Sequence, residues 1–155
     1  MNRFYSLPQP GLVLATLGIL ALAGTPVLAQ QVQMHVDGEY HLDVGSVHNN
    51  QVPAHADGYL YLSGSQNGLY FTIDTVVKGT NNHIEGTPTM IFDDGSTLTF
   101  YYELRRVIGT ILFEGNFVIV DGTGLFEGVS GSGEICYPVD GSGNGPLMMD
   151  GVLVW

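Results

Sequence analysis

Apolar and polar residues alternate over many short stretches after about residue 30, which is the pattern of β-strands with one face buried. The longest clear example is Thr97–Arg105, in which nearly every second residue is apolar. The apolar face of this stretch carries Leu98, Phe100, Tyr102 and Leu104. Its other face carries Thr97, Thr99, Tyr101, Glu103 and Arg105. We therefore expect a strand with one face toward a core and the other toward water or a lumen.

Further strands are predicted where β-branched and aromatic runs lie between clusters of Gly, Asn, Asp and Ser. They are Val32–Val36, Tyr40–Val47, Tyr59–Leu62, Leu69–Val77, Ile84–Phe92, Gly109–Val120, Gly133–Tyr137 and Gly151–Trp155. We expect tight turns at Asp37-Gly38 and at Asp94-Gly95, because Asp-Gly tolerates the positive φ angles of hairpin turns. The stretch His48–Asp57 is polar and contains a proline, so it is predicted to be a long loop.

One predicted strand, Gly109–Val120, has Gly115 within its apolar face. The other members of that face are Ile111, Phe113, Phe117 and Ile119. A glycine there suits a bend or a barrel corner, where a strand must coil sharply. Roughly seven to nine strands without a convincing helical period predict an all-β sandwich or barrel. The scarcity of lysines that would protect exposed edges favours the barrel, since closure removes edges.

The first 29 residues have the organisation of a secretory signal peptide. Arg3 supplies a basic start and Gly11–Ala23 is apolar. Val27 and Ala29 stand at the −3 and −1 positions of a small-residue cleavage site, so we expect cleavage before Gln30. The apolar run is shorter than the roughly 20 residues of a bilayer span, so the protein is expected to be exported, periplasmic or secreted. A retained N-terminal anchor is the alternative.

The mature chain, residues 30–155, has the size of one domain and is strongly acidic. Its basic residues are Lys78, Arg105 and Arg106, against 15 Asp and Glu residues. This imbalance argues against nucleic acid and against an anionic membrane surface as partners. The acids are interpreted as keeping an exported protein soluble. Cys136 is the single cysteine, so no intrachain disulfide is predicted.

A compact glycine-rich corner lies within Gly115–Tyr137, between two strand patterns. Residues 121–135 read DGTGLFEGVSGSGEI and follow the β-branched run Phe117–Val120. A corner that turns back on itself needs positive φ angles and close backbone approach, which glycine permits. The residues at its marked positions are Gly122, Gly124, Phe126, Gly128, Gly131 and Gly133. This segment resembles the corner of the allene oxide cyclase barrel-like proteins, a superfamily that includes the plant dirigent proteins.

The resemblance covers residues 58–155, and residues 90–98 (MIFDDGSTL) are similar to those of bacterial secreted members. It implies a single closed antiparallel β-barrel of about eight strands with an apolar lumen, often assembled as a homotrimer. Enzymes of this family guide a cyclisation or coupling by holding an apolar substrate in one conformation. In this chain the resemblance implies that Phe126 plugs one barrel end, while Gly122, Gly124 and Gly128 shape the corner.

This chain departs from the family at its catalytic positions. The cyclases carry a carboxylate near the start of the first strand, whereas residues 33–36 read QMHV. The dirigent catalytic Asp and Arg are likewise not recognisable, so we assign no catalytic residue. The aromatic residues expected to line the lumen and to contact a small apolar ligand are Tyr61, Phe71, Phe100, Tyr102 and Phe113.

Three acids are candidates for chemistry. Glu103 and Glu114 lie on strand faces that, if turned into the lumen, would raise their carboxyl pKa values by desolvation. The alternative is that both are solvated residues of the outer face. Glu127 belongs to the corner and is expected to accept backbone N–H groups there, with a catalytic role as the alternative.

No metal and no cofactor is predicted. The five histidines match no established ligand spacing. The segment Asp140–Gly145 fits the beginning of a calcium loop. Gly151, however, stands where that loop requires a bidentate glutamate, and no helices flank it, so a hairpin loop is predicted instead.

Two functions from different classes follow. The first is an exported barrel that binds a small hydrophobic ligand or partner without catalysis, which the missing catalytic residues favour. The alternative is a cyclase, isomerase or dirigent-like enzyme that steers an apolar substrate by steric confinement. A third is a structural role in the envelope or matrix, which a lumen filled by the protein's own side chains would favour.

Overall fold

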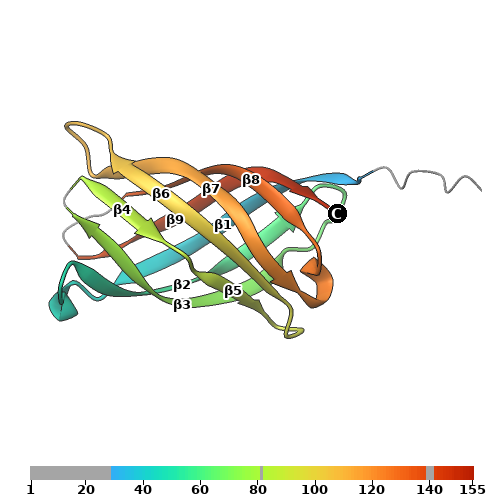
Figure 1. The fold of residues 1–155 in the computed structure, drawn as a ribbon, viewed down its shortest axis with the longest axis horizontal. Helices are drawn as coiled ribbons and strands as arrows, with labels where there is room; N and C mark the ends of the chain where they lie inside the picture. Colours follow the sequence, from blue (N-terminus) through green and yellow to red (C-terminus); the bar gives the residue numbers. More distant parts are fainter. Residues whose placement is uncertain (1–28, 81, 139–141) are drawn as a thin grey trace, which may run out of the picture.

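The computed structural model describes residues 29–80, 82–138 and 142–155, which form a β-barrel (Figure 1). The strands are β1 (Gln31–Leu42), β2 (Gln51–Leu62), β3 (Leu69–Thr80), β4 (His83–Gly86), β5 (Thr89–Phe92), β6 (Thr97–Arg106), β7 (Leu112–Thr123), β8 (Ser130–Pro138) and β9 (Asn144–Val154). Two short 3-10 helices, η1 (Val44–Ser46) and η2 (Gly124–Phe126), lie in the connections after β1 and β7. The predicted signal peptide lies outside the described residues, apart from its last position.

Neighbouring strands pair antiparallel, and the ladder closes on itself. The order runs β2-β1-β9-β8-β7-β6, after which β4 and β5 each pair with β6 on one side and with β3 on the other. Strand β3 then pairs with β2 and completes the barrel. Within the described residues the nine strands therefore occupy eight positions, because β4 and β5 share one. This arrangement confirms the predicted closed barrel.

Inward side chains fill the barrel along most of its length. The alternation predicted for Thr97–Arg105 is confirmed, because its apolar face is buried throughout. Fully buried side chains on other strands include Leu60, Phe71, Met90, Phe117, Met149 and Leu153. Burial of each large apolar side chain contributes about 1.5–3 kcal/mol to the free energy of unfolding. Most of the lumen is therefore a packed core and not a channel.

The 3-10 helix η2 follows β7 at one end of the barrel (Figure 1), and its Phe126 is buried. The Phe126 side chain is fully buried, and its ring centroid lies 4.8 Å from that of Phe92 and 6.5 Å from that of Trp155. The Leu125 N–H donates a hydrogen bond of 3.0 Å to the Ser96 hydroxyl, which joins the corner to the turn before β6. This end of the barrel is closed by aromatic packing.

The glycines of the corner are required for two different reasons. Gly124 and Gly128 have φ angles of +61° and +74°, which L side chains rarely adopt. Gly122 has no such φ angle, but a Cβ there would stand 2.3 Å from the backbone oxygen of Phe126. Backbone conformation thus selects glycine at the first two positions, and close packing beneath the plug selects it at the third.

The turn predicted at Asp37-Gly38 is wrong, because β1 continues through it. Gly38 lies opposite Gly58 of β2 in the ladder. A Cβ on Gly38 would stand 2.5 Å from the Asp57 backbone oxygen. The two glycines therefore allow two coiled strands to approach closely, and the Asp-Gly pair has no role in reversing the chain.

The loop predicted at His48–Asp57 is also wrong, because β2 begins at Gln51. The chain reverses just before it, at Asn49 and Asn50, whose φ angles are 50° and 59°. Asparagine tolerates this left-handed region because its short side chain can hydrogen-bond locally. Pro53 lies just beyond the end of the β1–β2 ladder, where its backbone oxygen still accepts the Asp43 N–H. The ladder does not need an N–H from residue 53 there, so a proline is tolerated.

Other boundaries differ in smaller ways. The predicted strand Ile84–Phe92 is divided into β4 and β5 at Thr87-Pro88. Ile111 precedes β7 and is 51% exposed, so it does not belong to the buried face. β8 and β9 are longer than predicted, and part of the expected hairpin loop Asp140–Gly145 lies outside the described residues. No helix among the described residues is long and apolar enough to cross a membrane.

The corner provides a test of these packing assignments. We expect Gly122→Ala to lower the free energy of unfolding by about 3 kcal/mol, because its Cβ would overlap a backbone atom that cannot rotate away. Gly128→Ala should cost about 1–2 kcal/mol, because it meets only the strain of a positive φ angle. Urea denaturation measures both. Gly45→Ala is the control, since its Cβ would make only an ordinary 3.5 Å contact. Equal losses at Gly122 and Gly45 would contradict the assigned packing.

Candidate functional site

A small apolar pocket remains inside the barrel on the side away from the η2 plug. Its walls include Tyr40, Ala54, Ala56, Thr75, Tyr102 and Tyr137. The pocket has a volume of about 40 Å³, and the empty space grows to about 400 Å³ when the part open to solvent is included. Alanines at 54 and 56 leave room on β2 that larger side chains fill elsewhere in the core. Within the described part of the barrel, this pocket adjoins a lumen that is otherwise largely filled by buried side chains.

Three tyrosines bring hydroxyl groups to this otherwise apolar pocket. Tyr40 comes from β1, Tyr102 from β6 and Tyr137 from β8, and all three are at most 6% exposed. The ring centroids of Tyr40 and Tyr137 are 4.5 Å apart, and Phe113 stacks on the other side of Tyr137 at 6.4 Å. Phe100 lies 6.1 Å from Tyr102. The three rings are thus held by aromatic neighbours, as rigid parts of the wall.

Two glycines make room for the tyrosine rings. A Cβ on Gly86 of β4 would stand 2.9 Å from the Tyr102 hydroxyl oxygen. A Cβ on Gly145 of β9 would stand 3.1 Å from the Tyr40 hydroxyl oxygen. Each hydroxyl therefore lies where any larger residue on the facing strand would displace it, so the positions of these two tyrosines depend on glycine.

The two innermost phenols stay neutral over a wide pH range. Burial raises the pKa of Tyr102 to about 12, although its contact with Tyr137 lowers that pKa slightly. Burial, and next the adjacent Tyr102, raise the pKa of Tyr137 well above its ordinary value. The Tyr137 hydroxyl interacts with that of Tyr102, but by distance and angle it makes no regular hydrogen bond to a described residue. It is a buried donor available to a ligand oxygen.

The residues predicted to line the lumen lie in different places. Phe100 and Tyr102 line the pocket. Phe113 is buried behind Tyr137, and Phe71 packs against Phe92 nearer the plugged end, at 6.3 Å between ring centroids. Tyr61 is 38% exposed and lies on the outer surface, so its placement in the lumen is wrong. On β2 the inward positions are the even-numbered ones, such as the buried Ala56 and Leu60.

The three candidate acids all lie outside the barrel. The Glu103 carboxylate is 45% exposed and contacts His83 Nε2 at 3.1 Å and Arg105 Nη2 at 3.5 Å. Glu114 is exposed on the outer face of β7. Glu127 is exposed in the corner, where its backbone N–H donates to the Gly124 oxygen at 3.2 Å. None of these carboxylates lines the tyrosine pocket, so the solvated alternative describes Glu103 and Glu114.

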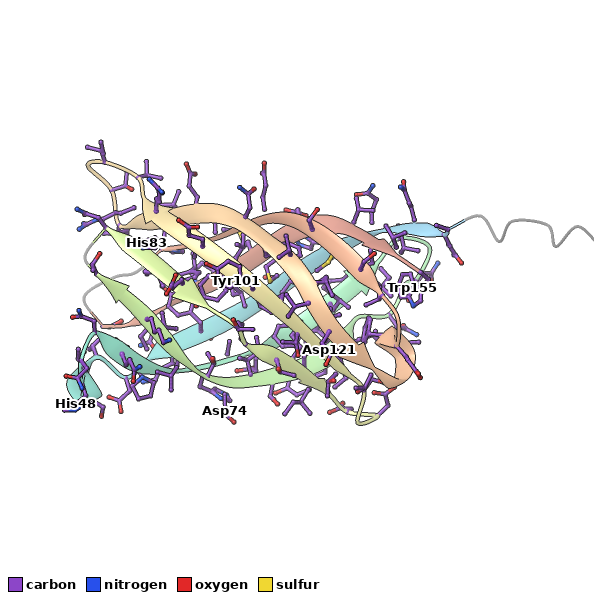
Figure 2. All side chains as sticks on the ribbon, in the orientation of Figure 1. His48, Asp74, His83, Tyr101, Asp121 and Trp155 are labelled. Carbon is purple, nitrogen blue, oxygen red and sulfur yellow. The ribbon has the colours of Figure 1, made fainter. Side chains whose placement is uncertain are left out.

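Histidines pair with acids on the outer face. His35 Nδ1 lies 2.7 Å from Asp150 Oδ1, and His55 Nδ1 lies 2.8 Å from Asp74 Oδ1. Figure 2 shows Asp74 pointing away from the barrel below β3. Among the residues that the structure describes, no group of three or more His, Cys, Asp or Glu is placed to hold a metal ion.

Sequence reasoning missed two of the three pocket tyrosines. Tyr40 and Tyr137 both belonged to predicted strands, but nothing local to either residue connects it with Tyr102. The signal that would have found Tyr40 is the alternation of β1, whose buried positions are Met34, Val36, Gly38, Tyr40 and Leu42. Reading β1 as one unbroken strand puts Tyr40 on its inward face.

The barrel is similar to two solved dirigent proteins. The pterocarpan synthase dirigent protein GePTS1 has a TM-score of 0.55 and 15% sequence identity, covering 81% of this chain and 90% of that one. The pterocarpan synthase dirigent protein PsPTS1 has a TM-score of 0.53 and 18% identity, covering 80% and 94%. No protein-family model and no curated protein matches the chain. The predicted resemblance is confirmed as a dirigent-like fold, and its link to allene oxide cyclases and to bacterial members stays a prediction.

The buried phenols predict a specific response to alkali. Their pKa values are raised in the folded state, to about 12 for Tyr102. The stability that neutral Tyr102 contributes is therefore fully present below about pH 10, the ordinary pKa of tyrosine, and is lost as the pH rises toward 12. Tyr102→Phe should therefore move alkaline unfolding, followed by circular dichroism, to higher pH. Tyr101→Phe alters the neighbouring ring, which is 36% exposed on the outer wall (Figure 2), and should move the midpoint less. Equal midpoints in the two variants would contradict the linkage.

Proposed function

We propose that this protein is a dirigent-like barrel that holds a small aromatic molecule at the tyrosine pocket and steers its reaction by confinement. The observation that carries the proposal is the buried Tyr137 hydroxyl, which lacks a well-aligned partner among the described residues. An unsatisfied buried hydroxyl costs about 1–3 kcal/mol, and a ligand oxygen placed beside it would remove that cost. The likeness to pterocarpan synthase dirigent proteins supports an aromatic substrate.

The pocket favours hydrogen-bond donation over proton abstraction. Phenols with raised pKa values are neutral at neutral pH, so they donate to an oxygen atom and do not act as bases. Among the described residues, the walls of the pocket carry no carboxylate. A bound ether, carbonyl or hydroxyl oxygen would be polarised and oriented, while the apolar walls fix the rest of the molecule.

The dimensions determine how a ligand sits. The enclosed 40 Å³ holds a small group, since a single water needs about 10–15 Å³. The surrounding empty space of about 400 Å³ includes the open mouth and solvent, so only part of an aromatic ligand would be enclosed. An oxygen-bearing substituent therefore enters the pocket, and the aromatic ring occupies the mouth.

Binding is tested with anisole and ethylbenzene, which have nearly the same shape but differ by one oxygen atom. We expect the native protein to bind anisole about tenfold more tightly, because the oxygen accepts one hydrogen bond. Tyr137→Phe should remove this preference and leave ethylbenzene binding unchanged. Tyr101→Phe, on the outer wall, should keep it. Chemical-shift titrations measure both dissociation constants, and binding of neither compound would contradict the pocket's proposed role and favour a structural one.

Steering is tested with 2′-hydroxychalcone, which cyclises in water to a racemic flavanone. In this isomerisation the phenol oxygen bonds to the β-carbon of the enone as the C=C π bond breaks, and the phenol proton ends on the α-carbon. A donor at the enone oxygen polarises the acceptor, so we expect the native protein to yield an excess of one enantiomer on a chiral column. Tyr137→Phe should return the product to a racemate. Anisole binding together with a racemic product in the native protein would instead support ligand binding without catalysis.

A further inference from the structure

The wall of the barrel has a gap between β3 and the strand position that β4 and β5 share. Thr72 is the last residue of β3 that pairs with β5, and Lys78 is the first that pairs with β4. Among the described residues, Ile73–Val77 has no ladder partner on this side. The facing segment from Ile91 back to Glu85 spans the same number of residues as Thr72 to Lys78. The register is therefore the same on both sides of the gap. The two strands separate and then meet again.

The separation affects only one side of the broken strand. On the β6 side, Gly86 pairs with Tyr102 and Thr89 pairs with Thr99 in a single register. Between them the Phe100 N–H donates a hydrogen bond of 3.1 Å to the Pro88 oxygen, so contact with β6 is kept. In Figure 1, β4 and β5 accordingly follow one another along β6, with β3 below them. The chain bows away from β3 alone.

Pro88 lies at the centre of the break. In the unbroken register it would face Thr75, but its oxygen accepts the Phe100 N–H, so the N–H that proline lacks would have pointed toward β6 and does not account for the opening toward β3. The inward and outward alternation continues through the break, with Ile84, Pro88 and Met90 buried and Thr87 exposed. The segment therefore remains part of the wall, paired with β6 and without ladder pairs to Ile73–Val77 of β3.

Hollows lie on both sides of this gap. The tyrosine pocket inside is lined by Thr75 and Pro88, and a depression outside is lined by Thr75, Thr87 and Tyr101, among others. Thr75 belongs to both. It occupies an inward position of β3 between the buried Ile73 and Val77, and yet it is only half-buried. A polar side chain thus lies between the pocket and the outside, at the point where the wall lacks a ladder.

The η2 end of the barrel is closed by the stacked aromatic rings around Phe126. Toward the other end, several inward side chains of the described strands are at most 6% exposed, among them Leu42, Val77 and Leu147. Val52 and Ala54 of β2 are half-buried there. The half-buried Thr75 in the side wall contrasts with the closed η2 end.

We propose that the gap between β3 and the β4–β5 break is the entrance to the tyrosine pocket, with Thr75 and Thr87 at its rim. The molecules it admits are small, neutral and aromatic, because the pocket behind it is lined mainly by apolar side chains and phenols. Lys78, Glu85 and Tyr101 surround the outer side and keep it hydrated. The existence of the entrance is independent of the proposed function, whereas the identity of the ligand rests on it.

The test blocks the gap reversibly. In a Cys136→Ser chain, Thr87→Cys is coupled to benzyl methanethiosulfonate, which attaches a ring at the rim and is removed by a reductant. Two control variants carry the same label: Ser132→Cys on the outer face of β8, and Val44→Cys in η1 at the barrel end. The first readout is NMR relaxation of the Ile73 and Ile135 methyl groups by dissolved oxygen, and the second is the association rate of anisole.

We expect the label at Thr87→Cys to slow anisole association about tenfold, because a narrowed route lowers the association rate more than the affinity. The label should also reduce oxygen-induced relaxation of the two methyl groups. Removing the label with the reductant should restore both values. The control labels should change neither readout by more than about twofold. Slower entry with the Val44→Cys label, and not with the Thr87→Cys label, would overturn the proposal in favour of the barrel end. The proposal would also be overturned if dissolved oxygen did not relax the two methyl groups in the unlabelled chain, or if the Thr87→Cys label left that relaxation unchanged. If oxygen relaxation responds but anisole does not bind, the entrance stands and the proposed function fails.

Discussion

A closed barrel requires every strand to satisfy the backbone of two neighbours at once. Seven of the eight strand positions described here are each occupied by one continuous strand. At the eighth, the chain keeps its ladder with β6 and leaves β3 over a few residues around Pro88. Because the register is the same on both sides of the break, closure survives it. The local loss of backbone pairing therefore produces a gap in the wall without changing the fold.

Close packing of aromatic rings on glycines determines what fills the barrel. A Cβ on Gly133 or Gly151 would stand less than 3 Å from the ring of Phe117, so these paired glycines let that ring lie flat on the wall. Gly86 does the same for Tyr102. In the middle of the barrel the arrangement completes a dry core. Near the gap the same arrangement positions a phenol hydroxyl, so one packing rule serves both stability and the candidate site.

Much of the fold could be predicted because strand alternation is a local property. The buried face of β6 was readable directly, and the glycine-rich corner marked a chain reversal packed on itself. The errors arose where one residue pattern has two physical causes. Asp37-Gly38 has the composition of a turn, but its glycine serves a close approach to Gly58, whose position in space the sequence does not contain. Tyr61 has apolar neighbours on both faces of β2, so its side of the wall depended on register.

The candidate site was harder to predict because it is assembled from distant parts of the chain. Tyr40, Tyr102 and Tyr137 lie on three strands that are far apart in sequence, and only barrel closure brings their hydroxyls to one pocket. Glu103 and Glu114, the acids considered as candidates for chemistry, are exposed to solvent, because strand alternation places them on the outer face. The groups that barrel closure buries are instead neutral phenols, which can orient an oxygen atom but cannot remove a proton at neutral pH. In the proposed function such a pocket selects the conformation of a molecule that already reacts by itself, because its described walls offer shape and hydrogen-bond donation and no carboxylate.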